Sequence, residues 1–143
     1  MDIRRLADSY AVSPQISPED VAALKAEGFA TVICNRPDGE IPPELQAARI
    51  GPVVEAAGMK FVVNPVIGGA MTPANVAAQA AAIAAATGPV FAYCASGNRS
   101  SQVWALAEAG RQSADALIAA AARFGYNLEP LRQRLEANAN GRA

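Results

Sequence analysis

The fold is constrained most by a regular alternation between short β-branched or aromatic runs and longer stretches rich in alanine and leucine. Such alternation is typical of a parallel sheet with helices on its faces. We expect strands at 10–12, 29–34, 61–64 and 90–93 and helices at 18–28, 43–57, 73–86, 113–124 and 128–137, with one more ending near 110. The pattern predicts an α/β fold with a central, mainly parallel sheet of four to five strands flanked by helices.

Other signals concern helix ends and domain organisation. Ser17-Pro18 is typical of a capped helix start, whereas Gly51-Pro52 predicts a kink or two short helices, because an interior proline removes a backbone hydrogen bond. Residues 138–143 follow the last expected helix, and we expect them to be flexible. Since 143 residues suit one core and no internal repeat is visible, we expect a single domain over 1–143.

The composition excludes several kinds of chemistry. The chain has no histidine, so it lacks a His general base, a Cys-His pair and His-ligated zinc. Its two cysteines, Cys34 and Cys94, lack the paired spacing of a structural zinc site. We expect no metal and no cofactor. A net charge of −1 argues against a nucleic-acid partner, because holding a phosphate backbone requires a basic surface.

The sequence also bears on location and partners. The segment 1–12 has charges throughout and no apolar core, so it does not resemble a signal peptide. The longest apolar run, 76–86, is mostly alanine and shorter than the ~20 residues of a membrane span. We expect a cytoplasmic, reducing location and no membrane partner. Alanine-rich helix faces suit close packing or a partner surface, so the oligomeric state stays open.

A polar segment containing glycine follows the expected strand at 90–93. It places Cys94 at the carboxyl end of that strand and Arg99 just before a helix, where open α/β sheets bind ligands. Successive N–H groups at a helix start bind anions, so we expect them to stabilise the Cys94 thiolate. Gly97 supplies a turn with positive φ, and Arg99 offers an oxyanion two parallel donors.

These residues form the candidate site. Cys94 and Arg99 are the expected catalytic residues, and the substrate-binding residues are Ala95, Ser96, Gly97, Asn98 and Ser100. Ser100 is also a candidate hydrogen-bond donor to the sulfur. In the alternative interpretation, Cys94 is an ordinary buried strand residue and Ser-Gly-Asn is a helix-entry turn. The strand-to-helix location of Cys, Gly, Arg and Ser together favours catalysis.

The segment Tyr-Cys94-Ala-Ser-Gly-Asn-Arg99-Ser resembles the active-site loop of rhodanese-like sulfurtransferases, in which four residues separate Cys from Arg. Cysteine-dependent protein phosphatases have a similar loop with five residues there and commonly a His at the position of Tyr93. The segments 13–18 and 32–40, with Asn64-Pro65-Val66, resemble the beta-lactamase hydrolase-like family, whose fold is phosphatase-like and which is often described as a sulfurtransferase. The resemblance, over about 10–110, implies a dual-specificity-phosphatase type of fold.

Two departures from the phosphatase pattern favour sulfur transfer. A shorter loop makes a smaller anion cradle, which suits one sulfane sulfur better than a phosphate. The loop 64–72, where phosphatases of this fold carry an Asp general acid, has no carboxylate. We therefore expect a sulfurtransferase that forms a Cys94 persulfide from thiosulfate or another persulfide. Its partners are then a small-molecule sulfur donor and a thiol acceptor.

Two other functions remain open: a phosphatase that forms a Cys94 phosphoenzyme, and a non-catalytic oxyanion or redox sensor. In the phosphatase, Asp38 or Glu40 is a candidate acid, although Pro-Asp-Gly favours a plain turn with Arg36 paired locally. Cys34 is a conceivable resolving thiol, but we expect a small buried hydrophobe.

Overall fold

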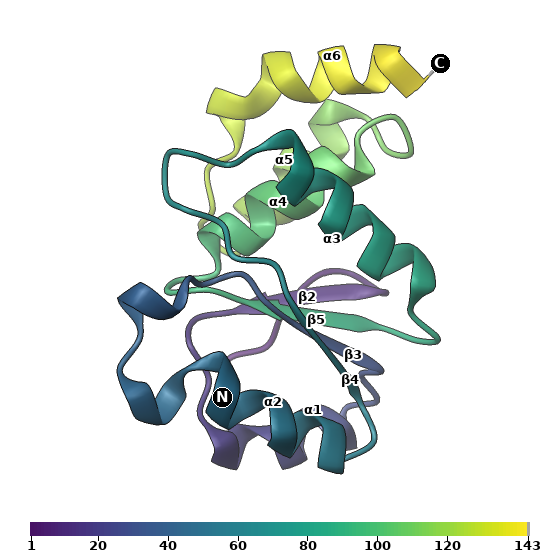
Figure 1. Ribbon diagram of the computed structural model, residues 1–143. Coiled ribbons are helices and arrows are strands. Elements are labelled where there is room, and N and C mark those ends of the chain that lie inside the picture. The colour runs from purple at the N-terminus through teal and green to yellow at the C-terminus, as the bar shows by residue number, and fades with distance from the viewer. Residues whose placement is uncertain (143) are drawn as a thin grey trace.

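A five-stranded sheet lies between two groups of helices (Figure 1). The structure is a computed structural model and describes residues 1–142. The strands are β1 Arg4–Ala7, β2 Tyr10–Ser13, β3 Thr31–Cys34, β4 Lys60–Val63 and β5 Val90–Tyr93. Their order is β1-β2-β5-β3-β4, with β1 antiparallel to β2 and the other neighbours parallel. The predicted mainly parallel sheet is confirmed, and β5 has a parallel neighbour on each side.

The carboxyl ends of the three middle strands lie at one level. Tyr93, the last residue of β5, is in register with Ser13 of β2 and with Cys34 of β3. Every residue of β5 is buried, because the sheet is covered on both faces, and this explains the unbroken apolar run in the sequence. Cys94 therefore leaves the sheet at the edge where parallel strands present ligand sites.

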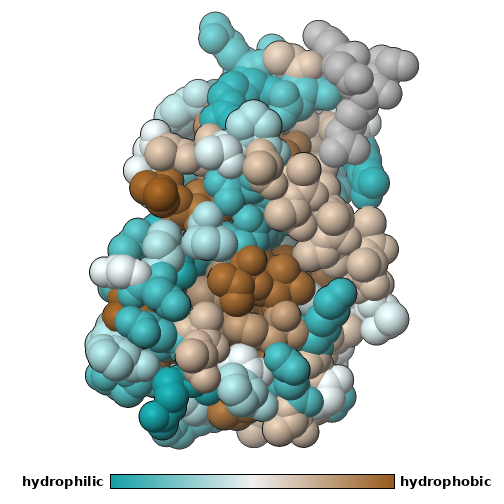
Figure 2. Space-filling view, viewed as in Figure 1, coloured by the Kyte–Doolittle hydropathy of each residue, from teal (hydrophilic) through white to brown (hydrophobic). Residues whose placement is uncertain are grey.

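Helices cover both faces of the sheet. On one side lie α1 Val21–Ala26 and α2 Ala47–Ala56, and on the other lie α3 Pro73–Ala85, α4 Asn98–Glu108, α5 Ala114–Ala122 and α6 Arg132–Arg142 (Figure 1). The exposed residues of α3 are mainly alanine. The surface over this helix is accordingly pale brown in the space-filling view (Figure 2).

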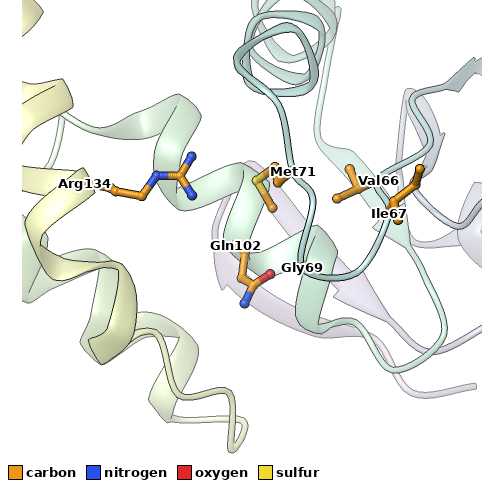
Figure 3. Close-up of a pocket in the computed structure, with 6 residues that line it drawn as sticks. All are labelled: Val66, Ile67, Gly69, Met71, Gln102 and Arg134. Atoms are coloured by element: carbon orange, nitrogen blue, oxygen red, sulfur yellow. The ribbon is translucent and has the colours of Figure 1, made fainter.

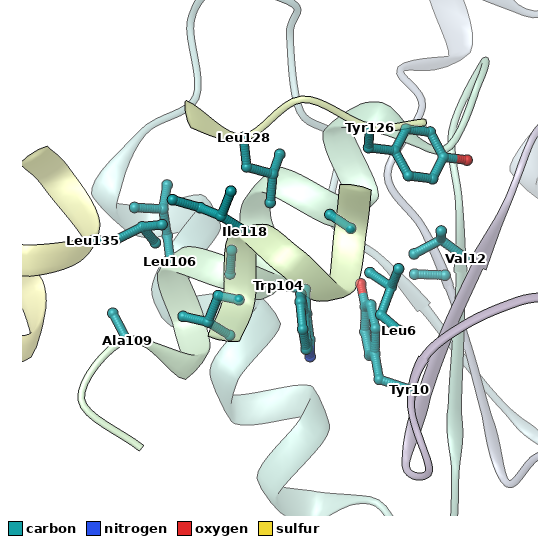
Figure 4. Packing of buried hydrophobic residues seen from close by; sticks show 14 of the residues in the cluster. Leu6, Tyr10, Val12, Trp104, Leu106, Ala109, Ile118, Tyr126, Leu128 and Leu135 are labelled. Carbon is teal, nitrogen blue, oxygen red and sulfur yellow. The ribbon is translucent and has the colours of Figure 1, made fainter. Parts of the chain in front are cut away.

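The core consists of two clusters, one on each face of the sheet. Side chains of β5 alternate between them: Phe91 and Tyr93 belong to the cluster under α1 and α2, and Ala92 to the other. In the cluster under α4, the Trp104 ring stacks on Tyr10 with centroids 5.6 Å apart (Figure 4). Trp104, an apolar residue at helical spacing in the sequence, is therefore a packing residue of the core.

The structure differs from the sequence analysis in three main features: a missed strand, the position of a helix break and the end of the last helix. The strand β1 was missed, since its Arg4-Arg5-Leu6-Ala7 has no β-branched residue and pairs at the sheet edge. The break expected at Gly51-Pro52 lies instead at Gln46, and α2 continues through Pro52. Pro52 has no N–H to donate to the carbonyl of Ala48, but Ala48 is exposed, so that water can take the place of the missing donor. The last helix extends to Arg142 rather than 137, and Ala143 of the expected flexible tail lies outside the described residues.

A buried polar network connects the sheet to the start of α4. Gln79 of α3 accepts hydrogen bonds from the side-chain amides of Asn35 and Asn64, each at 2.9 Å, and donates to the Tyr10 hydroxyl at 3.0 Å. The Tyr10 hydroxyl in turn donates to the Ser100 carbonyl at 2.9 Å. Gln79 therefore ties three parallel strands and α3 to the first turn of α4.

We predict that Gln79→Ala lowers the free energy of unfolding by at least about 2 kcal/mol, because it leaves buried amide groups of the network unpaired. Urea unfolding measures the change. Gln133→Ala, at an exposed position of α6, is the matched control and is expected to stay within about 0.5 kcal/mol of wild type. Equal effects of the two substitutions would contradict the structural role of Gln79.

Candidate active site

Cys94 lies at the base of a tight loop between β5 and α4. Its Sγ accepts a hydrogen bond from the N–H of Gly97 at 3.1 Å. Gly97 has φ +95°, so the predicted positive φ is present, and it directly precedes the first residue of α4. Cys94 itself is fully buried. A substrate therefore reaches the sulfur only when a group at the rim of the loop moves.

The loop also presents unpaired backbone donors. Within residues 1–142, the N–H groups of Ala95, Ser96, Arg99 and Ser100 have no acceptor. These groups lie between Cys94 and the first turn of α4, and unpaired N–H groups in a loop that opens a helix bind anions. The loop is consequently able to hold the oxygens of an oxyanion without reorganising its backbone.

Arg99 is oriented by contacts on one side of its guanidinium. Its Nη1 donates to Glu40 Oε2 at 2.9 Å and to the Val66 carbonyl at 2.8 Å, while Nη2 donates to Glu40 Oε1 at 2.7 Å. The pKa of Arg99 is raised, first by the Glu40 hydrogen bonds, with a further contribution from Cys94. Because a guanidinium has five N–H donors, its Nε–H and one Nη2–H remain for an oxyanion held above Cys94.

Glu40 acts as an ionised partner rather than as a proton donor. The Arg99 hydrogen bonds lower the pKa of the Glu40 carboxyl, and Arg36 lowers it further. Arg36 Nε lies 3.6 Å from Glu40 Oε1, so the local pairing expected for Arg36 is present as an ion pair. A carboxyl held ionised in this way is a poor general acid, and its role here is to position Arg99.

The structure gives Ser100 and Asp38 partners other than the sulfur or a substrate. The buried Ser100 hydroxyl donates to Asn35 Oδ1 at 2.9 Å rather than to Cys94. Asp38 Oδ1 accepts the N–H of Ala47, at 3.2 Å, at the start of α2. The turn interpretation of Asp38 is therefore the one the geometry favours.

The remaining residues of the predicted site lie on the loop itself. Ala95 and Ser96 are exposed, and Asn98 is half-buried at the first position of α4. The Ser96 hydroxyl accepts the N–H of Asn98 at 3.2 Å and so shapes the turn. The structure thus places Cys94, Gly97 and Arg99 at the connection between β5 and α4, as the sequence predicts.

Cys34 lies on the neighbouring strand but does not face the loop. It is level with Tyr93 and shares a core cluster with it, on the face under α1 and α2. Its thiol donates to the Arg36 carbonyl at 3.4 Å, and burial raises its pKa. The expectation of a small buried hydrophobe fits this environment.

Sequence reasoning missed the groups that hold the loop from outside. The Tyr126 hydroxyl donates to the Ser96 carbonyl at 2.8 Å and accepts from Arg4 Nη1 at 2.6 Å. The Gln15 N–H donates to the Ala95 carbonyl at 3.4 Å. The sequence around Tyr126 predicts a packing residue alone, because helical spacing and apolar character do not reveal a contact made 30 residues away along the chain.

Comparison with known proteins agrees with this architecture. Residues 2–111 match the family model described as "Beta-lactamase hydrolase-like protein, phosphatase-like domain". The chain belongs to this family. Beta-lactamase hydrolase-like proteins of Agrobacterium fabrum and Xylella fastidiosa are 35% and 31% identical to it over 73% and 90% of its length. The chain spans only 24% and 30% of the length of these two relatives.

Solved structures show the same phosphatase type of fold. A candidate phosphatase of Neisseria meningitidis is 34% identical, with a TM-score of 0.82, and the match covers 96% of this chain and 99% of that one. The structure of PTPMT1 matches with a TM-score of 0.77 at 16% identity, over 98% and 95% of the two chains. The fold predicted from the family resemblance is therefore confirmed.

Two further findings concern metal binding and membrane spans. Among residues 1–142, no group of three or more Cys, Asp or Glu side chains is arranged to bind a metal ion. Over the same residues, every helix is too short or too polar to cross a membrane.

We predict that Gly97→Ala destabilises the protein more than Gly28→Ala. Both glycines have positive φ, which costs an alanine about 1–2 kcal/mol. A Cβ at Gly97 would in addition overlap the Tyr126 hydroxyl, whereas a Cβ at Gly28 meets nothing within 4 Å. Urea unfolding of both variants separates the two costs. Equal losses would show that the loop does not depend on its contact with Tyr126.

A pH dependence follows from the Glu40–Arg99 pair. The pKa of Glu40 is lower in the folded protein than its ordinary value of 4.5. The pair is therefore fully present above that value and lost as the pH falls through the lowered pKa. We predict that Glu40→Gln lowers Tm by a few degrees at most at neutral pH, and that the difference shrinks as the pH falls below 4.5 and vanishes below the lowered pKa of Glu40. The exposed Glu44→Gln is the control, and a pH-independent difference would contradict the ion pair.

Proposed function

We propose that this chain is a cysteine-dependent phosphatase in which Cys94 attacks the phosphorus of a phosphate monoester. The observation that carries the proposal is the set of unpaired N–H groups of Ala95, Ser96, Arg99 and Ser100, together with the free edge of the Arg99 guanidinium, in the loop that follows Cys94. Membership of a family with a phosphatase-like domain supports it. These donors match the oxygens of a phosphoryl group.

The reaction has two steps. The Cys94 thiolate forms an S–P bond while the ester P–O bond breaks, and the leaving oxygen departs with the bonding electrons. Water then attacks the phosphocysteine, which releases inorganic phosphate and restores the thiolate. In both steps the loop N–H groups and Arg99 stabilise the negative charge on the phosphoryl oxygens.

The lack of a placed acid narrows the substrate class. The loop 64–72 contains no carboxylate, and Glu40 is engaged by Arg99. A leaving group then has to depart without protonation, which aryl phosphates and acid anhydrides tolerate better than alkyl phosphates. We propose aryl phosphates as the substrate class.

Sulfur transfer, the function favoured by the sequence, is the second candidate, and the missing acid supports it as well. In that reaction the Cys94 thiolate attacks the sulfane sulfur of thiosulfate, an S–S bond forms, and sulfite leaves with the electrons of the broken bond. An acceptor thiolate then takes the sulfane sulfur and restores Cys94. The matching family model is described as a phosphatase-like domain and the Neisseria meningitidis structure as a phosphatase, so we place sulfur transfer second.

We predict hydrolysis of para-nitrophenyl phosphate by the wild-type protein, inhibited by vanadate, and at least a thousandfold loss in Cys94→Ser, since removal of a nucleophile typically costs about 10⁶ in kcat. Cys34→Ala is the matched control, because the Cys34 thiol lies in the core cluster under α1 and α2 and donates to the Arg36 carbonyl, and it is expected to keep the activity. The readout is released nitrophenolate under steady-state conditions.

A parallel assay with thiosulfate and cyanide distinguishes the second candidate. Formation of thiocyanate that requires Cys94, without phosphate release from the aryl ester, would replace the phosphatase proposal with sulfur transfer. Hydrolysis that survives in Cys94→Ser would remove both candidates.

A further inference from the structure

A hollow lies beside the cysteine loop, on the side of the sheet that carries α4 and α6. It has a volume of about 180 Å³ and is lined by Val66, Ile67, Gly69, Met71, Gln102 and Arg134 (Figure 3). Ligand pockets that bury a whole drug-sized molecule measure roughly 300–1,000 Å³. The hollow is therefore the size of a subsite that receives one end of a ligand.

The two polar side chains that line this hollow have no partner in the part of the chain that the structure describes. Among residues 1–142, neither the Arg134 guanidinium nor the Gln102 side-chain amide has a hydrogen bond or an ion pair. By contrast, the neighbouring Arg132 is paired with Asp115 and Glu129. The lining contains one cation and no carboxylate, so its charge favours an anion.

The apolar part of the lining comes from the loop after β4. Val66 is buried, whereas Ile67 is 62% exposed although it is a large apolar side chain. In Figure 3, Arg134 extends from α6 toward Met71 of this loop. A ligand group that fits both features has an apolar or aromatic body and a charged end.

The hollow is connected to the candidate active site through two residues. The carbonyl of Val66 accepts the hydrogen bond from Arg99 Nη1, while the same residue lines the hollow. Gln102 follows Arg99 by three positions on α4, so both belong to one face of that helix. The subsite and the cysteine loop therefore share the wall formed by Val66 and the first turns of α4.

We propose that this hollow binds a second anionic group of the substrate, a carboxylate on an aromatic or short apolar body, whose reacting group lies at Cys94. Arg134 forms the ion pair with the carboxylate, and Gln102 donates a hydrogen bond to it. The loop residues Val66 and Met71 contact the apolar body. The placement of the reacting group at Cys94 rests on the proposed function. The binding of a carboxylate in the hollow is independent of it. Arg134 lies beyond the residues 2–111 that match the family model.

The direct test is a nitrogen-15 NMR titration of the whole chain with 4-hydroxybenzoate, compared with the neutral 4-hydroxybenzamide. We expect shifts of the Gly69 and Gln102 amides with the carboxylate, weaker shifts with the amide, and loss of the difference in Arg134→Gln. Arg49→Gln removes the same charge from an exposed position of α2, across the sheet. This control is expected to retain the difference between the two ligands. No shift at these amides, or shifts that Arg134→Gln leaves unchanged, would overturn the subsite.

Kinetics then test the link to the reaction. We expect the ratio of kcat/KM for 4-carboxyphenyl phosphate to that for 4-carbamoylphenyl phosphate to fall roughly three- to fivefold in Arg134→Gln, the size of one partly exposed ion pair. Arg134→Lys is expected to restore part of the ratio. Hydrolysis of both esters with an unchanged ratio would overturn the substrate role and leave the phosphatase proposal intact. Hydrolysis of neither ester, with the NMR shifts present, would reject the phosphatase and retain the anion subsite.

Discussion

The hydrogen bond from the Gly97 N–H to the Cys94 sulfur depends on a backbone that turns with φ +95° between the central strand and α4. Only glycine adopts that conformation at low cost, and a side chain there would collide with Tyr126. Because Gly97 directly precedes the first residue of α4, the same turn also starts the helix whose first N–H groups are unpaired. The position of the nucleophile, the unpaired donors and the start of the helix all follow from this one turn.

The rest of the fold holds that turn in place from several directions. The network around Gln79 and Asn35 fixes the first turn of α4 from below, through Ser100. Tyr126 fixes the loop from the other side, through the Ser96 carbonyl. These polar contacts are buried or half-buried, where each unpaired group would be costly. Among the described residues 1–142, the loop is therefore supported by hydrogen bonds and not by a disulfide.

Much of the site was predictable because it is local in sequence. Cys94, Gly97 and Arg99 lie within one strand-to-helix connection, so strand period, glycine and helix start locate them without knowledge of the tertiary structure. The partner of Arg99 was not predictable in the same way. Glu40 lies 59 residues away, and its proximity depends on the order in which β3 and β5 pair. Ser100 shows the same limit, since its acceptor Asn35 lies 65 residues away.

The electrostatics of the site separate the roles of its charged groups. Glu40 stays ionised beside Arg99, so it orients the guanidinium and leaves one edge free for an oxyanion. The loop 64–72 contains no carboxylate either, so it offers no acid that could protonate a leaving group. The same geometry suits an aryl phosphate and a sulfane sulfur, because both leaving groups depart unprotonated. The two reactions differ in the group that becomes attached to the Cys94 sulfur, which is a phosphoryl group in one and a sulfane sulfur in the other.

The most direct measurement is the intact mass of the protein after rapid acid quenching of its reaction with para-nitrophenyl phosphate, followed by peptide mapping. The account predicts one added phosphoryl group, located on Cys94 and absent in Cys94→Ser. Turnover of the ester with no adduct, or with the phosphoryl group on another residue, would contradict the assignment of Cys94 as the covalent nucleophile of a phosphatase.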